Sequence, residues 1–126
     1  MASVLVVEDD PGVRDMLELT LATEGFATEV AVDGEEAIGR LDRDPVDLVI
    51  LDIMMPGIDG FAVLKELRAR ARWAGVPVIV ATARGEDDDV WAGWAAGADY
   101  YLVKPFDLDE LRRVCVRLVA DAQRPG

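Results

Sequence analysis

The chain has 126 residues, enough for one domain with a hydrophobic core, and 52% of its residues are hydrophobic while 30% are charged. Twenty-five acidic against thirteen basic residues give a net charge of −12, so we expect the domain itself to be repelled by nucleic acid and by anionic membranes. The absence of histidine and the single Cys115 exclude histidine-based catalysis and an internal disulfide. Neither a membrane-spanning run nor a signal peptide is visible, which makes the cytoplasm the expected location.

Apolar runs that predict strands alternate with helical patterns along the whole chain. The predicted strands cover residues 3–7, 26–32, 47–52, 76–82 and 99–103. Helices are predicted from Pro11, after Gly34, after Gly60, over 86–96 and from Leu108. Five alternations with short connections predict an α/β fold, a doubly wound parallel sheet with helices on both faces. We assign residues 1–122 to this domain and 123–126 to a C-terminal tail or the start of a linker.

The third predicted helix has one apolar and one charged side. Val63, Leu64 and Leu67 recur at the spacing of a buried stripe. The other side is charged and is expected to be exposed, with Lys65, Glu66, Arg68 and Arg70. In the last helix Cys115 falls at a core spacing, so we predict a buried and unreactive thiol.

Polar residues stand at the ends of four of the predicted strands. Glu8 and Asp9 follow the first strand, Asp52 ends the third, Thr82 ends the fourth, and Lys104 follows the fifth. In a parallel sheet these ends share one edge, which is where open α/β folds bind their ligands. Taken singly, each residue is more readily explained as a cap, a turn former or an ordinary strand residue. Five of them at successive strand ends indicate a functional cluster.

The chemistry of this cluster favours a cation and a phosphoryl group. Two carboxylates repel each other by roughly 4 kcal/mol at 4 Å when the effective dielectric constant is near 20. Oxygen ligands without histidine or cysteine favour magnesium, and Lys104 adds a positive charge that can pair with Asp52 or with an anion bound to it. A carboxylate nucleophile beside a divalent metal, a lysine and a hydroxyl can accept a phosphoryl group and form an aspartyl phosphate.

The segments VLVVEDD, DLVILDIMMPGIDGF, VIVATA and GADYYLVKPF resemble the receiver domain of bacterial two-component response regulators, in order and over almost the whole chain. The resemblance implies a flavodoxin-like fold with a five-stranded sheet of order 2-1-3-4-5 and five helices. It also implies that Asp52 takes a phosphoryl group from a sensor histidine kinase, or slowly from a small acyl phosphate. The resulting change of conformation would regulate an output domain or partner, transcription being one such output.

The same resemblance implies roles for individual residues. The ligands of Mg²⁺ would be Glu8, Asp9, Asp52 and the main-chain carbonyl of Met54, with Glu8 bound through water. Thr82 and Lys104 would contact the phosphoryl oxygens. The Lys104-Pro105 peptide bond is expected to be cis, which would aim the ammonium group into the site.

Three further residues match family positions that govern switching and phosphate lifetime. Tyr101 matches the aromatic switch: Thr82 would move to bond a phosphoryl oxygen, and Tyr101 would swing into the space vacated. The alternative for Tyr101 is a half-buried strand aromatic. Met54 and Arg84 flank the path of the attacking water. An apolar Met54 would hinder that water and Arg84 would shield the phosphate, so we predict a longer-lived aspartyl phosphate than with Asn at position 54.

The output face departs from the pattern of the subfamily that it resembles. ARGEDDD, GADYYLVKPF and FDLDEL resemble receivers of winged-helix transcription factors, which dimerise through their fourth helix, fifth strand and fifth helix by reciprocal ion pairs. Val90, Tyr100 and Val114 stand where a basic residue, an acid and an arginine are usual, so two of the ion pairs cannot form. We predict an apolar surface for a homodimer or an output partner. The alternative is that these side chains, with Trp91 and Trp94, pack into the core.

Three other functions fit parts of the pattern. A haloacid-dehalogenase-type phosphatase also forms an aspartyl phosphate, but such enzymes use a second aspartate two residues after the nucleophile, where this chain has Met54. A flavodoxin-like FMN carrier needs hydroxyls and amides in its first loop, which is acidic here. A receiver that no longer takes phosphate would lack key residues that are all present. We therefore expect a switch that catalyses only its own phosphorylation and dephosphorylation, and not a turnover enzyme.

Overall fold

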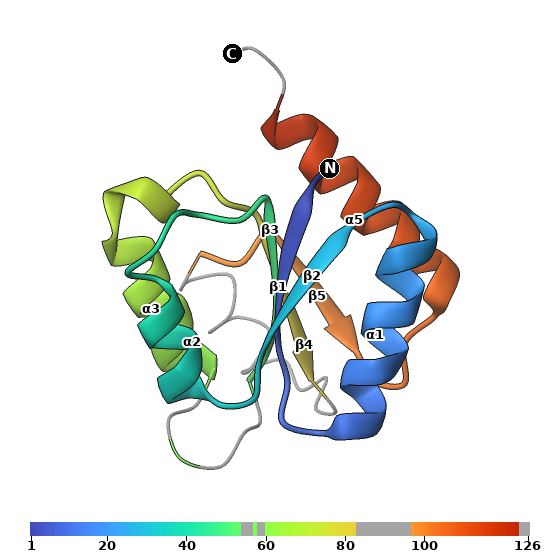
Figure 1. The fold of residues 1–126 in the computed structure, drawn as a ribbon, viewed down its shortest axis with the longest axis horizontal. Helices are drawn as coiled ribbons and strands as arrows, with labels where there is room; N and C mark the ends of the chain where they lie inside the picture. The colour runs from blue at the N-terminus through green and yellow to red at the C-terminus, as the bar shows by residue number, and fades with distance from the viewer. Residues whose placement is uncertain (54–56, 58–59, 83–96, 124–126) are drawn as a thin grey trace.

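The computed structural model describes residues 1–53, 57, 60–82 and 97–123. Within them five parallel strands form one sheet in the order β2-β1-β3-β4-β5 (Figure 1). The strands are β1 (Ser3–Val7), β2 (Ala27–Ala31), β3 (Leu48–Asp52), β4 (Val78–Thr82) and β5 (Tyr100–Val103). This order confirms the predicted doubly wound α/β fold.

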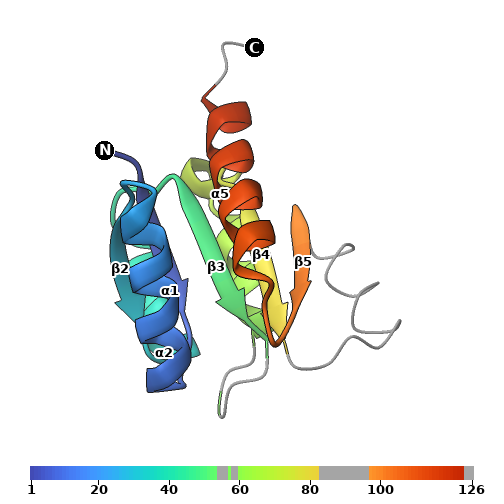
Figure 2. The same ribbon diagram turned by 90° about the vertical axis from the view of Figure 1, so that its right-hand side faces the viewer.

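Helices cover both faces of the sheet (Figures 1 and 2). One face carries α1 (Pro11–Thr23) and α5 (Leu108–Ala122), and the other carries α2 (Gly34–Arg40) and α3 (Gly60–Ala69), which the short 3₁₀ helix η1 (Ala71–Trp73) follows. Four of the five predicted helices are therefore observed, and the helix predicted over 86–96 lies outside the described residues. No helix in the described ranges is long and apolar enough to cross a lipid bilayer.

Aspartate side chains fix where three of the helices begin. Oδ1 of Asp10 accepts hydrogen bonds from the N–H groups of Gly12 and Val13 at 2.8 and 3.1 Å, which satisfies backbone donors that a helix start otherwise leaves unpaired. Asp33 and Asp107 cap α2 and α5 in the same way. Because α1 begins directly after Asp10, the connection from β1 is short, and the two acidic residues before the cap stay at the end of the strand.

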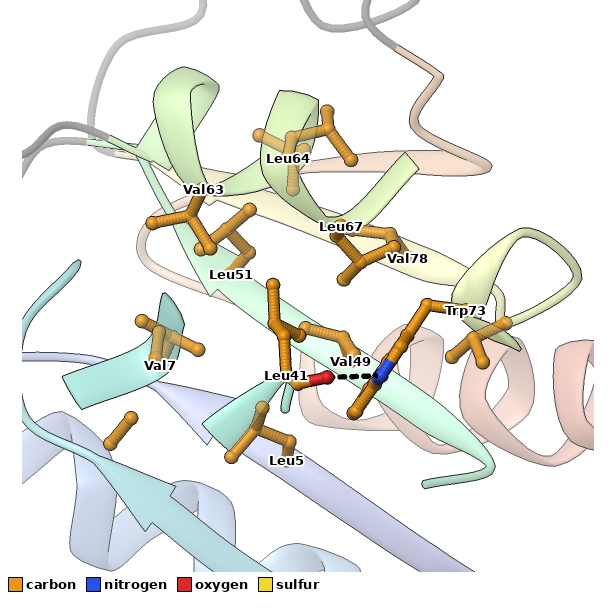
Figure 3. Close-up of a cluster of buried hydrophobic side chains, with 14 of the residues drawn as sticks. Leu5, Val7, Leu41, Val49, Leu51, Val63, Leu64, Leu67, Trp73 and Val78 are labelled. Atoms are coloured by element: carbon orange, nitrogen blue, oxygen red, sulfur yellow. Dashed lines mark hydrogen bonds between the residues drawn. The ribbon is translucent and has the colours of Figure 1, made fainter. Parts of the chain in front are cut away.

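The core lies on both faces of the sheet, because β3 is buried along its whole length. Figure 3 shows the face under α2 and α3, where Val49 and Leu51 of β3 meet Leu64 and Leu67 of α3. Trp73 is fully buried there, and its Nε1–H donates to the carbonyl oxygen of Leu41 at 2.9 Å. Burying each large apolar side chain stabilises the fold by about 1.5–3 kcal/mol relative to leaving it exposed.

The strand register brings the functional candidates to one edge of the sheet. Asp52 pairs with Ala81 on β4, and Thr82 pairs with Val103 on β5. We call this the carboxyl edge, since all five strands end there, and the opposite rim the amino edge. Helix α3 begins at the carboxyl edge and returns to the amino edge, as a crossover between parallel strands requires.

Candidate functional site

Three carboxylates converge at the carboxyl edge. Glu8 and Asp9 follow β1, Asp52 ends β3, and each offers an oxygen that lies within 4.8 Å of the others. Glu8 and Asp52 are 2% and 4% exposed, whereas Asp9 is exposed. Burying two carboxylates side by side is costly unless a positive charge or a proton compensates them.

Lys104 supplies the positive charge that the structure places among these carboxylates. Its Nζ lies 2.5 Å from Oε1 of Glu8 and 3.3 Å from Oδ2 of Asp52. The Lys104-Pro105 peptide bond is cis, which confirms the prediction made for it. Three carboxylates and one ammonium leave two negative charges on the cluster when all four groups are ionised.

Burial and the neighbouring charges change the pKa of Glu8. Burial is the largest cause of the rise, a hydrogen bond with Asp52 and the charge of Asp52 add to it, Lys104 opposes it, and together they raise the pKa of Glu8 to about 7. Burial alone would lower the pKa of the Lys104 ammonium, but its hydrogen bond to Glu8 and the negative charge of Asp52 outweigh burial, so the net shift is upward. The Lys104 ammonium therefore stays charged, and the Glu8 carboxyl group is partly protonated near neutral pH.

The donor set fits a hard divalent cation. Carboxylate oxygens are the ligands that Mg²⁺ prefers, and the uncompensated charge of the cluster would be offset by such an ion. Asp9, exposed at the rim, leaves an approach from solvent. Of the predicted ligands, Glu8, Asp9 and Asp52 are brought together, while Met54 lies outside the described residues.

Comparison with known proteins decides the family. The family model of the response regulator receiver domain matches residues 4–115. The chain belongs to this family. TcrA, a transcriptional regulatory protein of Mycobacterium tuberculosis, is 46% identical over 108 residues, which are 86% of this chain and 42% of that protein. RegX3, a sensory transduction protein of the same species, is 45% identical over 111 residues, 88% of this chain and 48% of that protein. The receiver domain thus spans about half the length of the curated relatives it matches.

Solved structures agree with this receiver domain in fold. The receiver domain of the sensor histidine kinase PA1611 from Pseudomonas aeruginosa, with a magnesium ion coordinated in its active-site cleft, is 31% identical, with a TM-score of 0.87 over 94% of this chain and 98% of that one. The response regulator TrrA from Thermotoga maritima, in complex with Mg²⁺ and BeF, is 39% identical, with a TM-score of 0.83 over 94% and 99%. Receiver domains of response regulators act as phosphorylation-activated switches with sensor histidine kinases and output domains, and the phosphatase alternative finds no support.

The receiver's predicted switch residues are placed only in part. Thr82 ends β4, and its backbone pairs with Val103, the residue before Lys104. Tyr101 lies on β5, half-buried against the core under α2 and α3. Arg84, predicted to shield the phosphate, lies outside the described residues.

The predicted output face is partly visible in this receiver. Tyr100 and Val114 are half-buried against the core under α1 and α5, and Val90 lies outside the described residues. Both line a groove of about 450 Å³ between β5 and α5, together with the charged residues Glu110, Arg113 and Arg117 and with Leu118. Their apolar surface is therefore a half-buried groove wall with charged neighbours, and not a fully open patch.

Two positions on α3 have contacts that the sequence pattern did not predict. Gly60, the first residue of α3, touches the backbone of the site: a Cβ there would lie 2.5 Å from the carbonyl oxygen of Asp52. Arg68 was expected to be exposed and is instead half-buried, because its guanidinium group binds main-chain carbonyls. The apolar stripe of α3 gave no sign of those carbonyls, since they come from later parts of the chain.

Proposed function

We propose that this receiver domain is a phosphorylation-driven signalling switch in which Asp52 is the phosphoryl acceptor. The observation that carries the proposal is the buried Asp52 carboxylate, 3.3 Å from the Lys104 ammonium and grouped with Glu8 and Asp9. Oδ of Asp52 would attack the phosphorus of a kinase phosphohistidine, so that a P–O bond forms as the P–N bond to the imidazole breaks. The same carboxylate would accept slowly from a small acyl phosphate.

The surrounding charges explain how this step would proceed. Glu8, Asp9 and Asp52, with the carbonyl of Met54, would hold Mg²⁺, which when bound neutralises charge on the transferred phosphoryl oxygens. Lys104 already lies between Glu8 and Asp52, so its ammonium would contact a phosphoryl oxygen with little movement. The domain would in this way catalyse its own phosphorylation and dephosphorylation and no other reaction.

The proposed response involves Thr82 and Tyr101. Thr82 would bond a phosphoryl oxygen, and the half-buried Tyr101, one strand further along the sheet, would turn inward. Inverting a population from 1:99 to 99:1 takes about 5.5 kcal/mol of differential binding. Met54 and Arg84 would slow hydrolysis, and Met54→Asn is expected to shorten the lifetime of the aspartyl phosphate.

The face of Val90, Tyr100 and Val114 would bind the partner that responds to phosphorylation. The support is the groove between β5 and α5, whose wall combines Tyr100 and Val114 with charged residues, as in surfaces that bind a partner. The occupant would be a second receiver or an output partner. The relatives TcrA and RegX3 make transcription the output we propose, with the kinase and this switch meeting in the cytoplasm.

Intact mass spectrometry tests the proposed acceptor. After treatment with Mg²⁺ and acetyl phosphate, the parent chain is expected to gain the mass of one phosphoryl group, and Asp52→Asn is expected to gain none. Asp47→Asn is a matched control, because Asp47 precedes the same strand at the amino edge and its contact to the N–H of Ser3 survives in the amide. Labelling of Asp52→Asn as complete as that of the parent would refute the assignment.

A further inference from the structure

Helix α3 is attached to the phosphoryl-acceptor strand at its first residue. At Gly60 a Cβ would lie 2.5 Å from both the carbonyl oxygen of Asp52 and the Cα of Ile53, so only glycine permits this approach. The N–H of Gly60 also points to the carbonyl oxygen of Ile53, at 3.4 Å. The start of α3 therefore rests directly on the backbone that carries the Asp52 side chain, with no side chain between them to absorb a shift.

The last turn of α3 is attached to the start of β5. Nε and Nη2 of Arg68 donate to the carbonyl oxygen of Gly97 at 3.0 and 2.7 Å, and Nη2 also donates to Oδ2 of Asp99 at 2.9 Å. The same Oδ2 accepts the N–H of Val78, the first residue of β4, at 2.8 Å. Nη1 donates to the carbonyl oxygen of Val76 at 2.7 Å. One guanidinium thus holds the beginnings of β4 and β5 together.

Between these two ends α3 has little freedom to bend or slide. Val63, Leu64 and Leu67 are buried against the sheet, and packed interiors resist displacement because each shift opens a void or forces an overlap. The helix has 10 residues and so spans about 15 Å, close to the length of a five-residue strand. A rigid element of this length joins the carboxyl edge to the amino edge.

We propose that α3 is a strut that links the position of Asp52 to the position of the start of β5, with Gly60 and Arg68 as its two attachments. Arg68 is then a positioning residue, acting on the phosphoryl-acceptor site from the opposite edge of the sheet. The proposal rests on the proposed function and adds to it a second connection between the site and β5, separate from Thr82. The strand it reaches carries Tyr100 and Tyr101, the residues of the groove and of the proposed switch.

Linkage gives the strut a measurable consequence. If the bound state moves the backbone of Asp52, the Arg68 contacts resist that movement, because α3 cannot move without disturbing Gly97 and Asp99. Weakening the Arg68 attachment lowers this resistance and favours the bound state. A change at the amino edge then tightens binding at the carboxyl edge, as coupling between sites requires.

The test measures the affinity of the chain for beryllium fluoride in saturating Mg²⁺, by isothermal titration calorimetry, because this anion mimics a phosphoryl group on Asp52. Arg68→Lys keeps the charge but loses the planar fork that reaches several carbonyls at once. We expect it to bind beryllium fluoride about threefold or more tightly than the parent, within the range by which remote residues modulate coupling. Asp99→Asn, which removes only the charge from one attachment, is expected to shift the affinity in the same direction by less.

Arg72→Lys is the matched control, because Arg72 is also at the amino edge but its hydrogen bonds, within the described part of the chain, go to residues 42–44. Its affinity for beryllium fluoride should equal that of the parent. Unchanged affinity in folded Arg68→Lys, or in Asp99→Asn if the first variant does not fold, overturns the strut while leaving Asp52 as the acceptor. A parent chain that binds no beryllium fluoride overturns the proposed function and the strut with it.

Discussion

The two edges of the sheet use charged side chains in different ways. At the carboxyl edge, three carboxylates share one ammonium, and Glu8 holds its proton up to about pH 7 because burial raises its pKa. At the amino edge, each arginine that follows the middle of α3 pairs with an acid, and its other N–H groups bind main-chain carbonyls. Arg68 is the clearest case, with donors satisfied by Val76, Gly97 and Asp99.

The charged groups of one edge stabilise the fold, and those of the other edge are available to bind a ligand. At the amino edge, guanidinium groups donate hydrogen bonds to main-chain carbonyls. Leaving such carbonyls buried without a hydrogen bond would cost free energy. The carboxyl edge instead retains negative charge that a proton on Glu8 or an added cation offsets, and its groups are positioned to bind a ligand. Changes at the amino edge should therefore alter mainly stability, apart from the coupling that α3 carries from Arg68, and changes at the carboxyl edge should alter binding and phosphorylation.

Lys104→Met should give the largest effect and tests the binding side of this comparison. Removing the ammonium takes away the positive charge next to Glu8 and Asp52, so the rate of phosphorylation by acetyl phosphate should fall by about a hundredfold to a thousandfold, the usual cost of losing one group that stabilises developing charge. The rate is read from intact mass against time. Lys65→Met, on the exposed side of α3, is the control that should keep the parental rate.

The pH dependence of stability should reveal the proton on Glu8. The folded chain holds this proton up to about pH 7, whereas the unfolded chain releases it near the ordinary pKa of 4.5. Between these values the folded state binds more protons than the unfolded state, so the free energy of unfolding falls as pH rises, by on the order of 3 kcal/mol in metal-free buffer. Urea titrations from pH 4.5 to 8 should show this fall.

Glu8→Gln removes the titrating group and should flatten that part of the profile, while Glu35→Gln, an exposed residue of α2, should leave it intact. Since Mg²⁺ needs the ionised carboxylate, the apparent affinity of the parent for Mg²⁺ should rise with pH through about 7. A stability profile that is the same in the parent and in Glu8→Gln would show that Glu8 does not carry this proton.

How much of this contrast could be read from the sequence differs between the edges. The carboxyl edge could be predicted, because each of its residues directly follows or ends a strand and strands are local patterns. Glu8, Asp52 and Lys104 are 44 and 52 residues apart along the chain, yet parallel pairing alone brings them together. The predicted sheet order followed from the family resemblance, and the structure confirms it.

The amino edge could not be predicted in the same way. Arg68 was expected to be exposed because it lies beside the apolar stripe of α3, and nothing in that stripe points to Gly97 or Asp99. Trp73 has no periodic neighbours that mark it as core, and its partner, the carbonyl of Leu41, carries no side-chain signature. Every residue carries a backbone carbonyl, so the sequence cannot show which carbonyl a given side chain binds. Such contacts are known only once the fold is known.

Trp73→Phe tests the stability side of the comparison. The variant keeps an aromatic ring in the core but leaves the carbonyl of Leu41 buried without its donor, and it removes part of the buried ring. The free energy of unfolding should fall by about 1–3 kcal/mol. Phosphorylation of the folded variant by acetyl phosphate should proceed at the parental rate. A folded variant that phosphorylates markedly more slowly would mean that Trp73 supports the phosphoryl-acceptor site as well as the core.

Arg72→Gln should give the smallest effect and marks the limit of the amino-edge argument. Arg72 pairs with Asp44 at 3.2 Å and donates to the carbonyls of Asp42 and Arg43, but the side chains of the ion pair are 57% and 97% exposed, so water screens or replaces these contacts and ordering the side chains costs entropy. The melting temperature should therefore stay within about 2 °C of the parent, whereas Arg68→Gln, which strips a half-buried group of its carbonyl and carboxylate contacts, should melt clearly lower. Equal melting temperatures for the two variants would mean that the half-buried contacts of Arg68 add no more stability than the exposed contacts of Arg72 do.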